Sequence, residues 1–212
     1  ITNLESEIDS LLASPHYGER MAIAWLDQVR FADTIGYHSD NPHNVWPYRD
    51  YVIESFNKNK PFDRFTIEQI AGDLMPGANQ ETKVGSAFNR LLLTTEEGGA
   101  QAKDYEQRML TDRVRAIGNA WMGQTTGCAQ CHDHKFDPIA HKEYYQMFAF
   151  LNNQDEPEMK VFDPKTDVKG LTEEFKEVEA KIKAYMKEHA AELDAWEAGI
   201  TPAIKKSLNA SI

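Results

Sequence analysis

Cysteine is scarce in this sequence: only two occur among 212 residues, and they lie three positions apart. The sequence also lacks any apolar run near the roughly 18 residues that a membrane-spanning helix needs. Basic residues are few, with 23 Lys and Arg against 34 Asp and Glu, giving a formal net charge of -11. That balance argues against nucleic acid or an anionic membrane surface as the main partner.

Both cysteines fall in one pentapeptide, Cys128-Ala129-Gln130-Cys131-His132. This spacing is the attachment signature of a covalently bound c-type haem. Each thiol can add across one haem vinyl group, and the histidine beside the second thiol can then ligate the iron axially. We therefore predict one covalent haem c per chain, held by Cys128, Cys131 and His132.

Other uses of the two cysteines remain open. A thioredoxin-like redox pair would need a preceding strand, but the segment from Thr111 to Gln124 has a helical pattern. The two cysteines could also form a disulfide or remain free thiols. A zinc site could combine the cysteines with two of three nearby side chains, His132, His134 and Asp137.

A covalent haem also bears on the compartment. The first residues, Ile1 to Glu5, do not resemble a secretion signal. Covalent haem attachment normally takes place outside the cytoplasm, and neighbouring free thiols would be a liability in an oxidising compartment. We therefore expect a periplasmic or otherwise extracytoplasmic chain that is a piece of a larger exported protein.

Apolar residues recur at helical spacing almost throughout, and sustained alternation typical of strands is missing. The predicted fold is therefore all-α: an irregular helical haem-binding domain followed by a helical hairpin or coiled-coil arm. The expected helices of the haem domain cover residues 4–12, 17–32, 47–57, a segment opening at Pro61, 104–124 and 141–151.

Two long polar loops interrupt these helices, Gly36 to Trp46 and Thr94 to Lys103. The second contains Glu96 and Glu97, which could form a carboxylate pair for acid–base work or a flexible acidic turn. Both loops are long enough to serve a function besides turning the chain.

A domain boundary is expected where prolines and a glycine break regular structure, between Gln154 and Gly170. We assign residues 1–153 to the haem domain, 154–170 to a linker and 171–212 to the arm. In the arm, Leu171, Phe175, Val178, Ile182 and Tyr185 form a heptad seam, and a second apolar group follows at Leu193, Trp196, Ile200 and Ile204.

Several short motifs run in a fixed order along the chain: His16–Arg20, Trp25–Asp27, Arg30–Thr34, Trp46–Ile53, Asn59–Asp63, Gln69–Asp73 and Thr126–Pro138. Over about residues 5–152 the chain thereby resembles the second planctomycete-type cytochrome-like domain, a family of unknown function. Phe31 and Phe62 stand where tyrosine is common in that family.

The resemblance implies haem c and an extracytoplasmic setting. Such domains sit in large exported proteins with another cytochrome-like domain upstream and a further domain downstream, sometimes with carbohydrate-binding modules. Redox partner domains or proteins, and carbohydrate-associated neighbouring domains, are the partners that this setting implies.

A sixth iron ligand is the least determined part of the predicted site. His38 in the first polar loop is the leading candidate. Alternatives are His43, His141 and the methionines at 109, 122 and 147, although each methionine also fits an apolar helical stripe.

Further side chains could line a haem pocket. Arg49 and Arg90 could pair with haem propionates, or else with Asp33, Asp50 or Asp73. Trp46, Phe136, Tyr144 and Tyr145 could wall the pocket or belong to an ordinary core. His134 could contact a propionate, support the ligand His132, bind a separate metal with Asp137, or organise its own loop.

Three functions are compatible with these residues. The first is an electron-transfer module with six-coordinate iron. The second is a haem enzyme, peroxidase-like or directed at a carbohydrate, with an open sixth position. The third is a structural module in which haem or zinc staples a helical fold.

Overall fold

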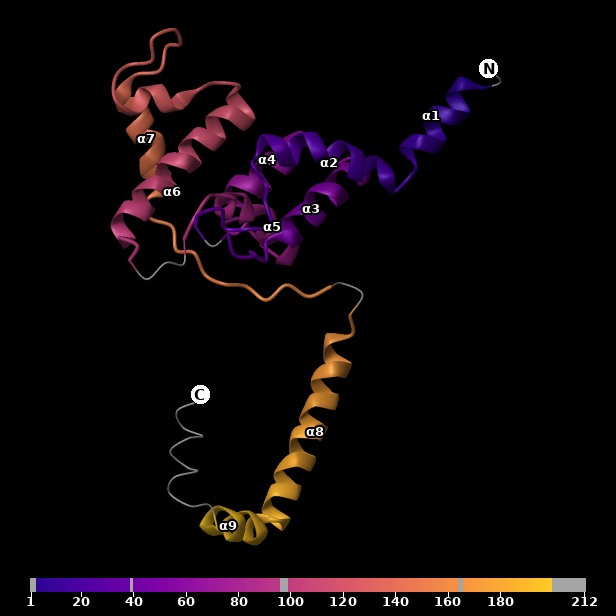
Figure 1. Ribbon diagram of the computed structural model, residues 1–212. Coiled ribbons are helices and arrows are strands. Elements are labelled where there is room, and N and C mark those ends of the chain that lie inside the picture. The colour runs from indigo at the N-terminus through magenta and orange to yellow at the C-terminus, as the bar shows by residue number, and fades with distance from the viewer. Residues whose placement is uncertain (1–2, 39, 96–98, 164–165, 200–212) are drawn as a thin grey trace. The chain divides into compact units, whose positions relative to one another are not determined.

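The computed structural model describes residues 3–38, 40–95, 99–163 and 166–199, and the chain divides into two compact units, residues 1–161 and 162–212. Its described residues form helices and turns without a strand, apart from two isolated bridges, Thr34 with Pro42 and Gly36 with Thr94. The all-α prediction is therefore confirmed (Figure 1). The expectations for Glu96, Glu97, Ile200 and Ile204 lie outside the described residues.

The first unit carries most of the helices, and residues 154–161 of the expected linker also belong to it. In chain order it contains α1 (Leu4–Leu12), α2 (His16–Gln28), α3 (Trp46–Asn57), α4 (Phe62–Ala71), α5 (Gln80–Gly85), the 3-10 turn η1 (Ser86–Arg90), α6 (Ala102–Ile117), the π-helical turn η2 (Gly118–Met122), the 3-10 turn η3 (Thr126–Gln130) and α7 (His141–Leu151).

The helix expected over residues 17–32 ends early, at Gln28. Arg30 N–H donates to the carbonyl of Asp27 at 3.0 Å and Phe31 N–H donates to that of Leu26 at 2.9 Å. Arg30 has φ 60°, so this is a Schellman end with an arginine where glycine is usual. The helix expected over 104–124 begins at Ala102 and changes to a π-helical turn at Gly118.

Trp25 joins α2 to α3 and α4 in the core. Its indole N–H lies 2.9 Å from Oε1 of Gln69 and 3.2 Å from the hydroxyl of Tyr48. Tyr48 also donates to Oε1 of Gln69, and burial raises the pKa of the Tyr48 phenol. The Trp25 ring contacts Phe65 and Trp121, so this part of the core is aromatic and the polar tips of Trp25 and Tyr48 are paired.

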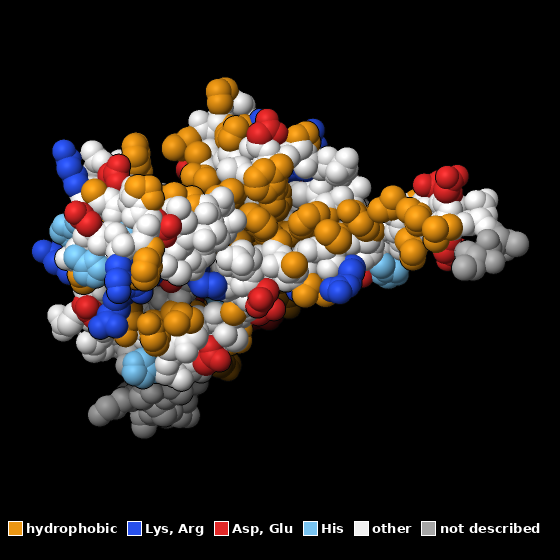
Figure 2. Space-filling view, turned by 90° about the horizontal axis from the view of Figure 1, so that it is seen from above, with side chains coloured by type: hydrophobic (Ala, Val, Ile, Leu, Met, Phe, Trp, Pro, Cys, Tyr) orange, Lys and Arg blue, Asp and Glu red, His pale blue; other side chains and the backbone are white. Residues whose placement is uncertain are grey.

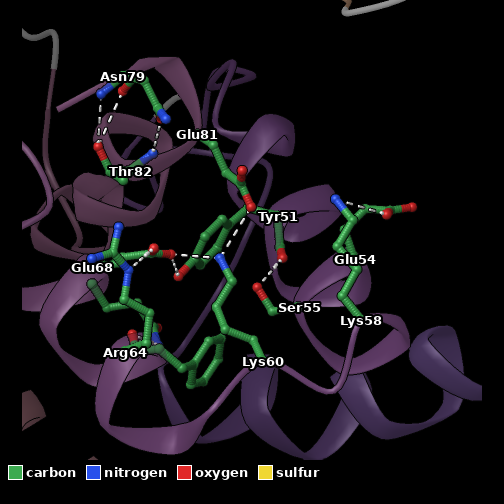
Figure 3. A network of polar contacts seen from close by, with 12 residues as sticks. Tyr51, Glu54, Ser55, Lys58, Lys60, Arg64, Glu68, Asn79, Glu81 and Thr82 are labelled. Carbon is green, nitrogen blue, oxygen red and sulfur yellow. Dashed lines mark hydrogen bonds and ion pairs between the residues drawn. The ribbon is translucent and has the colours of Figure 1, made fainter. Parts of the chain in front are cut away.

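A buried carboxylate, Glu68, ties α3, α4 and the segment between them together (Figure 3). It accepts hydrogen bonds from Tyr51 Oη at 2.9 Å, Lys60 Nζ at 2.5 Å and Arg64 Nε at 2.6 Å. Lys60 also contacts Glu81 of α5, at 3.1 Å. Burial alone would raise the pKa of Glu68, but these hydrogen bonds hold its pKa below the usual value.

The segment after α7 is fastened to the first unit by Glu156. Its carboxylate pairs with the buried Arg113 of α6, and its backbone carbonyl accepts a hydrogen bond from Arg90 Nη1 at 3.1 Å. Arg113 also donates to the carbonyl of Asn89 at 2.8 Å. Glu156 therefore connects η1, α6 and the chain that leaves α7.

The second unit contains α8 (Val168–Glu188) and α9 (Ala190–Gly199). The described seam residues of α8 are exposed: Leu171, Phe175, Val178, Ile182 and Tyr185. In the first unit, α1 also exposes apolar side chains, which Figure 2 shows along this projecting helix. Among the described helices, none has the length and apolar character to cross a bilayer.

Candidate cofactor-attachment site

The pentapeptide of Cys128 to His132 lies on the side of α6, where two glycines allow close approach. A Cβ at Gly118 would lie 2.5 Å from Cγ2 of Thr126, and one at Gly127 would lie 2.6 Å from Nε of Arg115. Thr126 fixes the approach by donating through Oγ1 to the carbonyl of Val114 at 3.2 Å. The π-helical turn that ends α6 thus leads into η3, which packs back against the helix.

The two thiols share one turn of 3-10 geometry. Cys128 lies within η3 and Cys131 follows it as the C-cap residue, with the Cys131 N–H donating to the carbonyl of Cys128 at 3.5 Å. Both cysteines are exposed and are not joined in a disulfide, while Ala129 between them is buried. The turn therefore anchors itself through the buried Ala129 and leaves both cysteines exposed.

His132 is exposed beside the thiols, and its tautomer is set by the backbone. Its Nδ1 lies 2.6 Å from the carbonyl oxygen of Asp133. Because a carbonyl only accepts, Nδ1 must carry the proton, and Nε2 keeps the lone pair that binds a metal. A backbone carbonyl on the other ring nitrogen is the usual support of a ligating histidine.

Gln130 connects the turn to α6 and α7. Its carbonyl accepts from Tyr145 Oη at 3.2 Å and lies 3.0 Å from His141 Nε2. Its side-chain oxygen accepts from Arg115 Nη2 at 3.0 Å. Sequence reasoning missed Gln130 and Arg115, because their partners are distant in the chain and leave no local signal.

His134 organises the loop that follows the turn. Its side chain is only 5% exposed, and Nδ1 accepts the backbone N–H of Asp137 at 2.9 Å. Its own N–H donates to the carbonyl of Ile139 at 2.8 Å. Of the three side chains that could complete a zinc site with the cysteines, His134 turns its Nδ1 into its own loop. Within the described residues no group of three or more His, Cys, Asp or Glu side chains is arranged to hold a metal ion.

Three of the predicted wall residues belong to this part of the molecule, and one of them, Tyr145, contacts the carbonyl of Gln130. Phe136 lies on the loop after His132, with 84% of its surface exposed. Tyr144 lies behind the turn on α7, fully buried, and burial raises the pKa of its phenol.

The predicted residues of α3, Arg90 and His38 lie elsewhere. Trp46 and Arg49 are on α3, which Figure 1 places across the first unit from α7, and Arg49 pairs with its neighbour Asp50 at 2.9 Å. Arg90 pairs with Glu156, which is not among the three partners considered from the sequence. His38 follows Tyr37, whose ring contacts Tyr105 in the first turn of α6, with a centroid separation of 6.0 Å.

The turn fits a covalently attached haem on three observations. Both cysteines are exposed, the imidazole beside them keeps Nε2 available, and an exposed aromatic ring lies on the adjoining loop. The residues that would hold the group are Cys128, Cys131 and His132.

No curated protein matches the chain, and no solved structure matches it. A family model described as PSCyt2, protein of unknown function (DUF1549), matches residues 2–156. This range includes the whole of the candidate site, its supporting residues on α6 and α7, and Glu156. The chain therefore belongs to the PSCyt2 family of proteins of unknown function.

Proposed function

We propose that residues 1–161 form a c-type cytochrome domain that carries one covalent haem and transfers single electrons. The observation that carries the proposal is the arrangement of the 128–132 turn, in which both cysteines are exposed and His132 has its tautomer fixed by Asp133. When bound, the haem supplies a one-electron iron couple. The protein holds it through the two sulfurs and orients the His132 ring.

The polypeptide contributes a rigid platform. Thr126 and Arg115 fix the turn to α6, and Tyr145 fixes it to α7. Because the proximal histidine is held by a backbone carbonyl, its orientation does not depend on a mobile side chain. A fixed ligand geometry suits repeated electron transfer.

His38 remains our proposed second axial ligand. Tyr37 contacts Tyr105, while the turn contacts Thr111 and Val114 farther along α6. Tyr105 and Thr111 are separated by about 9 Å along the helix, at 1.5 Å per residue. Histidine on both sides of the iron would give a low reduction potential.

The setting is proposed with the function. Haem c and family membership support an extracytoplasmic domain of a larger exported protein, with redox partner domains or proteins and, in some relatives, carbohydrate-associated neighbours. An open sixth position on the iron would instead support the haem-enzyme alternative. A bound haem or zinc without redox activity would support the structural alternative.

A redox titration of the chain produced with a haem-maturation system tests the proposal. We expect a reversible one-electron transition and a low-spin spectrum. A doubly substituted Cys128→Ala, Cys131→Ala chain is the control and should carry no covalent haem. A haem-loaded chain that is high-spin and reacts with peroxide would overturn electron transfer in favour of the enzyme alternative.

A further inference from the structure

A small cleft lies beside the C-terminal end of α2, on the side of α6 that carries Asp112. Its volume is about 200 Å³. The walls come from the segment between α2 and α3, from residues 90–93 and from α6. Among the lining side chains are Arg30, Thr34, His43, Arg90, Leu93 and Asp112.

Arg30 occupies a backbone position that disfavours it. Its φ of 60° lies in the left-handed region, where glycine is the residue without a steric penalty. The guanidinium group reaches across the cleft wall, and Nη2 donates at 2.8 Å both to the carbonyl of Leu91 and to Oδ2 of Asp112. Arginine at this strained position therefore places a charged fork at the cleft.

Positive charge exceeds negative charge around the cleft, although the whole chain carries -11. Burial raises the pKa of Asp112, with Arg30 opposing that shift, and burial lowers the pKa of both Arg90 and Arg113. A second anion beside these arginines would relieve the cost of burying them. The charged groups that interact with one another at or beside the cleft, within the described chain, are four arginines and three carboxylates. The arginines are at 30, 90, 113 and 115, and the carboxylates belong to Asp112, Glu156 and Glu158.

We propose that this cleft binds a small organic anion, whose carboxylate or phosphate group lies between Arg30 and Arg90. Guanidinium forks match the planar oxygens of such groups. The apolar walls, Val45 and Leu93 among them, suit a short carbon body, and the volume admits only a small ligand.

Isothermal titration calorimetry of the full chain tests this assignment, with inorganic phosphate and acetate as separate probes. At least one probe should bind saturably. Arg30→Gln and Arg90→Gln should each weaken binding by about tenfold or more, because each removes a charge-assisted contact. Arg30→Lys keeps the charge and loses the forked guanidinium, so its affinity should lie between those of the parent chain and Arg30→Gln. This variant still tests the proposal if Arg30→Gln fails to fold.

Arg49→Gln is the matched control, since it removes one positive charge from a residue paired with Asp50 outside the cleft. It should leave the affinity unchanged. Absence of saturable binding by both probes, or equal weakening in Arg49→Gln, would overturn the proposal. Haem-free and haem-loaded chains should bind alike. Binding by the haem-free chain alone would refute a free anion as the ligand, because haem propionates would then occupy the arginines.

Discussion

Nδ1 of His134 accepts the backbone N–H of Asp137 at 2.9 Å, and this contact closes the loop after the cysteine turn. An atom that accepts this bond cannot carry a proton, so the 3.2 Å contact between the same nitrogen and the Asp137 carboxylate is not an ion pair. Of the roles considered for His134, the structure supports the organisation of its own loop.

Replacing His134 by alanine should therefore destabilise the fold. The change leaves the Asp137 N–H without its acceptor and removes a nearly buried ring, at a cost of about 1–3 kcal/mol. Urea denaturation measures the free energy of unfolding. The neighbouring exposed Lys135→Ala is the control, and a His134→Ala chain as stable as that control would contradict a role in closing the loop.

Glu68→Gln should cost about 2 kcal/mol or more, because it leaves Lys60, whose side chain is only 10% exposed, without its closest carboxylate. The exposed pair Glu54 and Lys58, at 3.4 Å, offers a control: Glu54→Gln should cost under about 1 kcal/mol. Equal losses in urea denaturation would show that the Glu68 network adds nothing beyond a surface pair.

The Glu68 effect should also depend on pH. The folded-state pKa of Glu68 lies below its value in the unfolded chain, which is about 4.3. The stability that ionised Glu68 provides is therefore fully present above that value and is lost as pH falls through the folded pKa. The stability difference between the parent chain and Glu68→Gln should shrink on acidification below about pH 4. A constant difference would contradict the assignment of an ionised Glu68.

Ending the chain at Lys160 should leave the first unit folded, whereas ending it at Asn153 should destabilise it. The longer form keeps Glu156 and its pairing with Arg113, and the shorter form leaves that arginine buried without its carboxylate. Circular dichroism melting curves distinguish the two. Equal stability of both shortened chains would show that residues 154–160 are dispensable for the fold.

His38→Ala should convert a low-spin haem spectrum to high spin and open the iron to carbon monoxide, if His38 is the second axial ligand as we propose. His16→Ala, at an exposed position on α2, serves as the control. An unchanged low-spin spectrum in His38→Ala would contradict His38 as the ligand, and His43, His141 or a methionine would then be the candidate.

The helices could be predicted from the sequence because apolar spacing is local, and His141–Leu151 was found at its observed bounds. The end of α2 could not, since Arg30 adopts the left-handed conformation where a glycine or asparagine would have given the signal.

The cysteine turn could also be predicted, because Cys128, Cys131 and His132 define it by their spacing alone. Its supports could not, because Gln130 meets Arg115 and Tyr145 only through tertiary packing. Arg90 likewise finds Glu156, 66 residues farther along the chain, rather than a nearby aspartate.

The most direct test of the account is the mass of the denatured chain after production with a haem-maturation system. Thioether bonds to Cys128 and Cys131 survive denaturation, so we predict a mass that exceeds that of the polypeptide by one haem, with haem staining retained on a denaturing gel. An unmodified polypeptide mass, with the haem-maturation system shown to be active on another cytochrome, would contradict the assignment of the 128–132 turn.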